Sequence, residues 1–151
     1  MIRGIDHIGI AVTSIEEGRK LYEAMGLHVE SIEEVPEEGV RVAFIPIGGS
    51  GGMRIELLES IAADSPIAKF LARRGPGIHH VCLASDGLAA DDAQLRAAGI
   101  ELLRPEPTRG AGGARVQFVH PKSAGGVLFE LSEPAPEGDP ERPENGGGQG
   151  E

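Results

Sequence analysis

The sequence predicts an α+β protein built from two tandem βαβββ modules. The first observation is an internal repeat, because the second half of the chain follows the first at an offset of 73 or 74 residues, as in the pairs His7–His80, Gly26–Gly99 and Glu56–Glu130. The second is the pattern inside each repeat, where a short apolar run leads into a capped helix and three more strand-like runs follow. Each half is too small to bury a core alone, so residues 1–133 are expected to form a single domain.

The first module is predicted to cover residues 1–62. Its first strand is the apolar run Ile5–Val12. Thr13 or Ser14 can then cap a helix with an acidic first turn, which Gly26 closes. Three strands are expected to follow, at Leu27–Val35, Gly39–Ile47 and Met53–Glu59.

A linker helix is predicted within residues 63–75, since Asp64-Ser65-Pro66 combines capping residues with a proline suited to the first helical turn. The second module, residues 76–133, begins with the strand Ile78–Ala84. Ser85 or Asp86 starts its helix, which Gly99 ends. Its remaining strands are expected at Ile100–Pro105, Ala114–His120 and Gly126–Glu133.

Residues 134–151 are rich in proline, glycine and glutamate, with no aliphatic residue beyond Ala135, so we expect a disordered acidic tail. The net charge of −10 argues against a nucleic-acid partner. No apolar stretch is long enough to cross a membrane. A single cysteine excludes an intrachain disulfide, and a reducing, cytoplasmic location is expected.

Two histidines and two glutamates carry most of the functional signal. His7 and His80 open apolar runs, and Glu56 and Glu130 lie inside apolar runs. A carboxylate in an apolar strand is costly unless its charge is compensated, and a divalent cation bound by two imidazoles and two carboxylates would do this. Small residues beside the histidines, such as Gly9, leave a hollow on the same strand face. The ligand set suits Co²⁺, Mn²⁺, Ni²⁺ or Zn²⁺.

The remaining histidines and the cysteine are interpreted as structural. Strand alternation places His79 on the face opposite His80, which favours a structural role. His28 and His120 are expected at the surface or in loops, and Cys82 is expected to be buried and inert.

Several segments resemble the vicinal oxygen chelate superfamily (glyoxalase, bleomycin resistance protein and dioxygenase) and, within it, the methylmalonyl-CoA epimerases. The matching segments are Asp6–Ala11, Asp64–Leu71, Gly77–His80, His120–Lys122 and Gly125–Leu131. The similarity spans residues 2 to 133. It implies that the two modules form a cupped, curved mixed β-sheet with the helices outside, and that His7, Glu56, His80 and Glu130 bind a divalent metal ion.

The resemblance also implies an activity. A metal-dependent epimerase would interconvert (R)- and (S)-methylmalonyl-CoA by 1,1-proton transfer, through an enolate stabilised by the cation. Glu130 is the first candidate for an acid–base group and Glu56 the symmetric second. The malonyl carboxylate or a CoA phosphate could pair with a basic residue, for which the candidates are Lys122, Arg41 and Arg115. The resemblance further suggests a homodimer.

Two departures from the epimerase pattern keep alternatives open. Many members have glutamine at the position of Glu56, whereas bacterial glyoxalase I enzymes use the His-Glu-His-Glu set found here, so a glyoxalase I (lactoylglutathione lyase) is the alternative. Bacterial epimerases commonly place a catalytic glutamate at the position of Val42, which cannot transfer a proton, so the second base remains open. A third alternative is a ligand-binding resistance protein of the same fold, although such proteins generally lack the four ligands.

Overall fold

The computed structural model describes residues 1–49 and 51–140. Within this part, eight strands form one mixed sheet in the order β2-β3-β4-β1-β5-β8-β7-β6. The strands are β1 (Ile2–Ala11), β2 (Ser31–Val35), β3 (Val40–Pro46), β4 (Arg54–Ser60), β5 (Gly77–Ser85), β6 (Thr108–Arg109), β7 (Arg115–Val119) and β8 (Phe129–Glu133). The order is symmetrical about the antiparallel pair β1–β5, and β1–β4 and β5–β8 are parallel. The predicted α+β class with two βαβββ repeats is confirmed.

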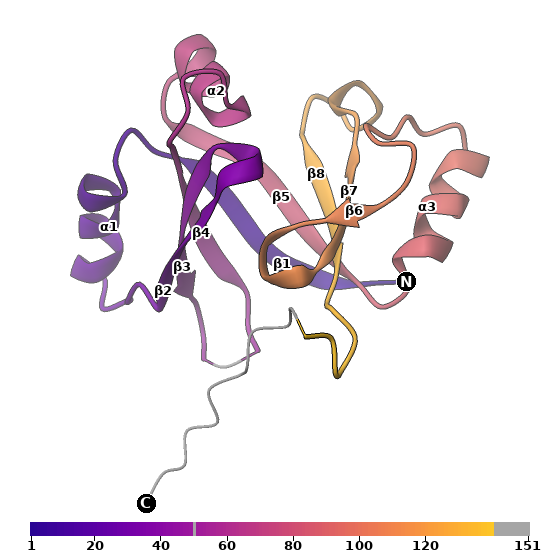
Figure 1. Ribbon diagram of the computed structural model, residues 1–151, viewed down its shortest axis with the longest axis horizontal. Helices are drawn as coiled ribbons and strands as arrows, with labels where there is room; N and C mark the ends of the chain where they lie inside the picture. The colour runs from indigo at the N-terminus through magenta and orange to yellow at the C-terminus, as the bar shows by residue number, and fades with distance from the viewer. Residues whose placement is uncertain (50, 141–151) are drawn as a thin grey trace, which may run out of the picture.

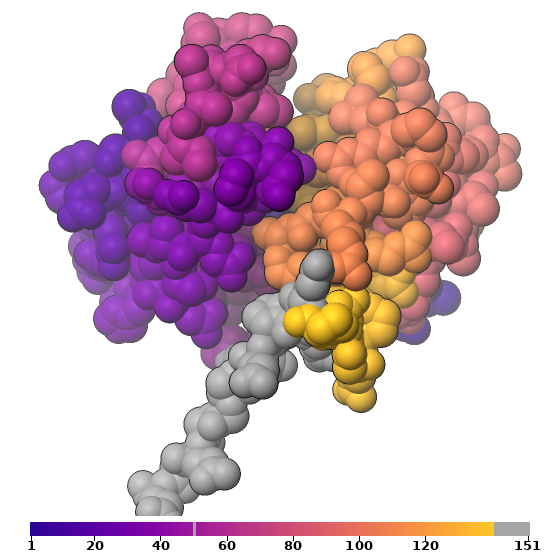
Figure 2. Space-filling model, viewed as in Figure 1, coloured from indigo at the N-terminus to yellow at the C-terminus, as the bar shows by residue number. Residues whose placement is uncertain are grey.

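Three helices lie outside the curved sheet (Figure 1). They are α1 (Ile15–Ala24), α2 (Pro66–Arg74) and α3 (Leu88–Ala97), and three short 3-10 turns accompany them, η1 (Pro36–Glu38), η2 (Ala111–Gly113) and η3 (Pro121–Ser123). α1 and α3 cover opposite flanks, as the repeat requires. Figure 2 shows the surfaces of the two halves, purple and orange, meeting on the front face. An ion pair between Glu38 and Arg104, at 3.4 Å, joins these halves.

The first two helices begin as their sequence suggests. Ser14 is the N-cap of α1, because its Oγ accepts a hydrogen bond from the Glu17 N–H at 3.4 Å. Ser65 caps α2 in the same way, accepting from the Ala68 N–H at 3.0 Å, and a proline follows it.

The start of α3 differs from the prediction. Gly87 occupies the N-cap position, and neither Ser85 nor Asp86 caps the helix. The Asp86 carboxylate is instead occupied by the N-terminal amino group at 2.8 Å and by Arg3. A tertiary partner has therefore displaced a local capping bond.

The predicted strand Ile100–Pro105 is wrong. Leu102 forms only an isolated bridge with Val119, and the edge strand is the two-residue β6. The carbonyl of Arg104 accepts hydrogen bonds from two side chains, Gln117 Nε2 at 3.1 Å and Arg96 Nη2 at 2.7 Å, instead of from a neighbouring strand. Proline residues at 105 and 107 also lack the N–H that a ladder needs.

The first module has a well-packed core between α1 and the sheet. Ile45 and Leu57 are fully buried there, with Ile15, Ala43 and Ile55 around them. The branched residues Ile8 and Ile10 of β1, and Val12 directly after it, pack against this cluster. They therefore face the helix, which leaves the opposite face of the strand for His7 and Gly9.

The predicted tail lies mostly outside the described residues. Residues 141–151 are not described, and of residues 134–140 Ala135 is buried, with 5% of its surface exposed. Asp139 pairs with Arg109 at 3.0 Å. No helix in residues 1–49 and 51–140 is long and apolar enough to span a membrane. The predicted cytoplasmic location stays a prediction.

Replacing Leu57 by alanine should lower the free energy of unfolding by about 2–5 kcal/mol, because the side chain is fully buried and its loss leaves a cavity. Urea denaturation followed by circular dichroism would measure the change. The control is Leu21→Ala on the exposed face of α1, where 62% of the residue is accessible. Equal losses in the two variants would contradict this account of the core.

Candidate metal centre

The four predicted ligands lie on the four adjacent central strands, in two rows that cross the sheet. In one row Gly9 of β1 pairs with Glu56 of β4 on one side and His80 of β5 on the other. In the other, Cys82 of β5 pairs with His7 and Glu130. Directly paired residues face the same side of a sheet, so the internal repeat brings the four side chains to one face, each row with a small residue at its centre.

Three of these side chains meet at ligand distance. His7 Nε2 lies 3.0 Å from His80 Nε2, and Glu130 Oε2 lies 3.1 Å from His80 Nε2 and 3.4 Å from His7 Nε2. Donor atoms at about 2.0–2.2 Å from one ion would be separated by about 3.0 Å in octahedral and about 3.4 Å in tetrahedral geometry. His7, His80 and Glu130 therefore form a candidate metal-binding cluster whose spacing fits a divalent cation.

Glu56 lies on the other side of the His7 ring. Its Oε2 atom is 2.9 Å from His7 Nδ1 and 3.0 Å from Arg54 Nε. Among the described residues, two groups have ligand atoms within 4.8 Å of one another, His7/His80/Glu130 and Asp6/His7/Cys82, and Glu56 belongs to neither. Its role as a fourth ligand stays a prediction.

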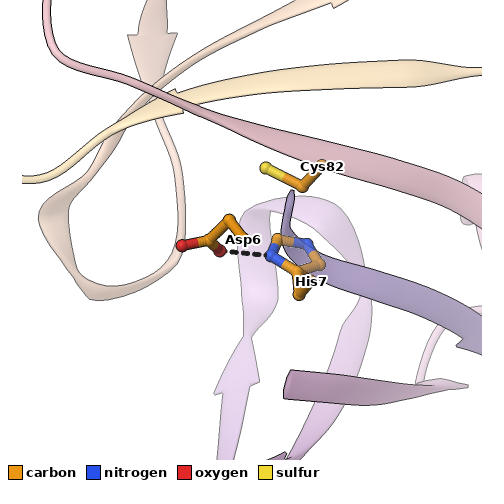
Figure 3. A group of neighbouring side chains, drawn as sticks. All are labelled: Asp6, His7 and Cys82. Atoms are coloured by element: carbon orange, nitrogen blue, oxygen red, sulfur yellow. Dashed lines mark hydrogen bonds and ion pairs between the residues drawn. The ribbon is translucent and has the colours of Figure 1, made fainter. Parts of the chain in front are cut away.

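Sequence reasoning did not assign Asp6 or His79 to the site, yet each contacts a histidine ligand. Asp6 Oδ2 lies 2.6 Å from His7 Nδ1. Figure 3 shows this contact as a dashed line, with Cys82 beside the same ring on the neighbouring strand. His79 Nδ1 lies 2.9 Å from His80 Nδ1. His79 lines the same cavity as His80, so its predicted placement on the opposite face is wrong. The internal repeat could have identified Asp6 and His79, because Asp6-His7 and His79-His80 occupy the same place in the two repeats.

The electrostatics of the cluster favour a cation. Burial alone would raise the pKa of Glu130, but hydrogen bonds with His7 and His80 lower it to about 2. Burial alone would lower the pKa of His7, yet its bonds to Asp6, Cys82 and the two glutamates raise it far above the usual value. Arg54 pairs with both Asp6 and Glu56. Once a cation displaces the His7 proton, three carboxylates and one guanidinium leave two formal negative charges, which a divalent cation would neutralise.

Two neighbouring groups are held in their uncharged forms. Burial, and then the charge of His80, lower the pKa of His79 to about 4. Burial raises the pKa of the Cys82 thiol to about 11. Cys82 is fully buried, as predicted, and a protonated thiol is a poor nucleophile.

The cluster faces a cavity of about 700 Å³ that both halves of the chain line. Its first-module wall combines an apolar patch, Val42 and Leu58 beside Phe44, with charged residues that include Glu30, Glu33 and Glu38. The opposite wall contains Phe118, the glycine-rich turn around η2, and Pro134 and Ala135 after β8. A cavity of this size is typical of a small-molecule site.

The three residues predicted to bind the substrate are Arg41, Arg115 and Lys122. Within the described part of the chain, none of them lines this cavity. Arg41 alternates with Val42 and pairs with Glu34 at 2.8 Å on the outer face, and Arg115 alternates with the lining residue Val116. Lys122 pairs with Glu101 at 2.6 Å near η3. The structure does not bring these residues to the metal cluster, and their role in binding CoA stays a prediction.

Residues 6–118 match the Glyoxalase/Bleomycin resistance protein/Dioxygenase superfamily. The chain belongs to this superfamily. Among individual relatives, this glyoxalase-superfamily protein is 39% identical to the uncharacterised protein YqjC of Bacillus subtilis, over 86% of this chain and 91% of YqjC. It is 37% identical to the mitochondrial methylmalonyl-CoA epimerase of Mus musculus, over 85% of this chain and 72% of the mouse protein.

Solved structures extend the similarity to the fold. A variant of Streptomyces coelicolor methylmalonyl-CoA epimerase, in complex with 2-nitronate-propionyl-CoA, superposes with a TM-score of 0.84. Its sequence is 38% identical, and the match covers 90% of this chain and 100% of that one. Within the superfamily, the chain is therefore a relative of the methylmalonyl-CoA epimerases, as the sequence motifs predict.

Replacing Gly9 by alanine should weaken divalent-metal binding by at least about tenfold, because a Cβ atom there would overlap three ring atoms of His80 and displace a ligand. Isothermal titration with Zn²⁺ would measure the affinity. Gly4→Ala is the matched control on the same strand, since a Cβ atom there meets nothing within 4 Å. Unchanged Zn²⁺ affinity in Gly9→Ala would show that the His80 ring does not need this space.

Proposed function

We propose that this superfamily member is a metal-dependent epimerase that interconverts (R)- and (S)-methylmalonyl-CoA. The observation that carries the proposal is the cluster of His7, His80 and Glu130, spaced for one divalent cation and facing a cavity lined by both halves. Co²⁺, Mn²⁺, Ni²⁺ and Zn²⁺ all suit two imidazoles and a carboxylate. The Streptomyces relative supports the substrate class, since it binds a propionyl-CoA that carries a nitronate group on carbon 2.

The reaction requires stabilisation of an enolate. A divalent cation in the cluster would supply Lewis-acid stabilisation of the negative charge that develops on the thioester when the α-proton leaves. His7, His80 and Glu130 would hold the cation, with Glu56 as the proposed fourth ligand. The apolar patch formed by Val42 and Leu58 would exclude water from the reacting carbon.

Inversion requires a proton to leave one face of the α-carbon and to return on the other. Glu130 and Glu56 are the proposed acid–base groups. Their carboxylates lie at opposite edges of the His7 ring, Glu130 Oε2 at 3.4 Å from Nε2 and Glu56 Oε2 at 2.9 Å from Nδ1. One carboxylate would accept the α-proton, and the protonated form of the other would donate a proton to the opposite face, so that composition is conserved and only configuration changes.

Glu130→Gln should reduce turnover of methylmalonyl-CoA by about 10²–10⁴-fold, because the amide cannot accept the α-proton and is a weaker cation ligand. Exchange of the α-proton with solvent deuterium, followed by ¹H NMR, measures the step directly. Glu17→Gln, an exposed carboxylate paired with Lys20 on α1, is the control and should retain wild-type exchange. Near-wild-type exchange in Glu130→Gln would end the assignment.

One observation favours a second candidate, a glyoxalase I. The glutamate at position 56 gives the His-Glu-His-Glu set, which the bacterial glyoxalase I enzymes share. Wild-type protein should therefore be assayed in parallel with methylglyoxal plus glutathione. Formation of the lactoyl thioester without any α-proton exchange on methylmalonyl-CoA would favour the glyoxalase. A chain that turns over neither substrate and retains no metal would favour a ligand-binding protein.

The proposed homodimer has a candidate surface on the central strands. Ile5 of β1 and Ile78 of β5 are 48% and 62% exposed, unusual for branched apolar residues in the middle of a sheet. Sedimentation velocity should give twice the chain mass for the wild type, and Ile78→Asp should shift it toward the monomer. A monomeric wild type would contradict the dimer.

A further inference from the structure

We propose that Asp6 and His79 are a matched pair of positioning residues, each holding one histidine ligand by its Nδ1 atom so that Nε2 faces the metal. The inference rests on the metal site of the proposed function, and it assigns roles to two residues that neither the quartet nor the reaction uses. It also makes the two ligands unequal, because one is held by a carboxylate and the other by an imidazole.

The same backbone feature places both residues. On β1 the pairing with β5 runs from Ile5–Leu83 to His7–Cys82, so Asp6 is an extra residue without a direct partner. On β5 the pairing runs from Gly9–His80 to Ile10–Ile78, so His79 is the extra residue. Extra residues of this kind form β-bulges, which redirect a side chain from its expected face. Asp6 and His79 are separated by 73 residues, the offset of the repeat.

The first-module contact fixes the tautomer of His7. Asp6 Oδ2 lies 2.6 Å from His7 Nδ1 and Glu56 Oε2 lies 2.9 Å from it, so Asp6 is the nearer of two carboxylates at this nitrogen. An ionised carboxylate can only accept, so His7 Nδ1 carries the proton. Arg54 Nη2 donates to the same Asp6 oxygen at 2.9 Å and holds the carboxylate in place. The Nε2 lone pair of His7 is then free for a cation, on the edge that faces His80 and Glu130.

The second-module contact fixes the tautomer of His80, with the imidazole of His79 in place of a carboxylate. His79 Nδ1 lies 2.9 Å from His80 Nδ1, so one nitrogen must donate and the other accept. His80 can offer its Nε2 lone pair to a cation only if its Nδ1 is the donor, which makes His79 Nδ1 the acceptor. The ring of Phe70, from α2, packs edge-on against His79 at 5.1 Å between centroids and fixes its orientation.

The hydrogen bond from His7 to Asp6 and the one from His80 to His79 differ in strength. A hydrogen bond to an ionised carboxylate is roughly twice as strong as one between neutral groups. Loss of Asp6 should therefore weaken metal binding more than loss of the His79 acceptor. If the substitutions acted only by disrupting packing, the two losses of metal affinity should be similar, because His7 and His80 are buried to a similar degree.

Isothermal titration with Zn²⁺ tests the pair. Asp6→Asn should lower the affinity by about 10–100-fold, and His79→Phe, which retains an aromatic ring but removes the acceptor, by about tenfold. His79→Gln supplies an amide oxygen to His80 Nδ1 and should recover most of the loss. Glu101→Gln and His28→Phe are matched controls away from the cluster and should bind as the wild type does. Circular dichroism checks the fold of each variant.

Long-range ¹H–¹⁵N NMR on the Zn²⁺-loaded wild type supplies a readout that requires no variant. The proton should lie on Nδ1 of His7 and His80, and on Nε2 of His79. Unchanged Zn²⁺ affinity in Asp6→Asn and His79→Phe, or a proton on Nε2 of His7 or His80, would overturn the inference while leaving the metal site intact. A wild type that binds no Zn²⁺ would overturn both proposals. The expected pattern without epimerase turnover would support the positioning roles and contradict only the reaction.

Discussion

The antiparallel pairing of β1 with β5 is the interaction on which the rest of the structure depends. It joins the two repeats into one sheet, and its register sets Gly9 between Glu56 and His80, and Cys82 between His7 and Glu130. A shift of this register by one residue would place the site residues of the two halves on opposite faces of the sheet. The glycine leaves room for an imidazole ring to lie across the strand, which brings the two histidines to 3.0 Å.

The charges of the candidate metal centre favour a divalent cation. Three carboxylates lie around His7 and His80 in a largely buried position, with Arg54 as the neighbouring guanidinium. Buried charges are tolerated only when paired, so the excess negative charge creates a binding potential for a divalent ion. Arg54 also offers a reason why a glutamate is tolerated at position 56, since its guanidinium contacts Glu56 directly at 3.0 Å.

Much of the fold and the identity of the cluster could be predicted from the sequence. The repeat offset, the alternation of apolar residues and the capping serines identified most of the strands and helices, because these signals act over a few residues. The duplicated His7 and His80, with Glu130, stood out for a chemical reason, as ionisable groups inside apolar strands need a partner. The resemblance of the flanking motifs then identified the superfamily.

Only the tertiary structure decided which further residues join the site. Asp6 and His79 reach the histidines through bulges, and a bulge depends on pairing between strands 73 residues apart, which no local pattern reports. The expected strand at Ile100–Pro105 failed for a similar reason, because side chains from α3 and β7 take the carbonyl that a ladder would use. Local composition determined the elements and the ligand types, whereas contacts between distant segments determined the register, the cavity and the support of each ligand.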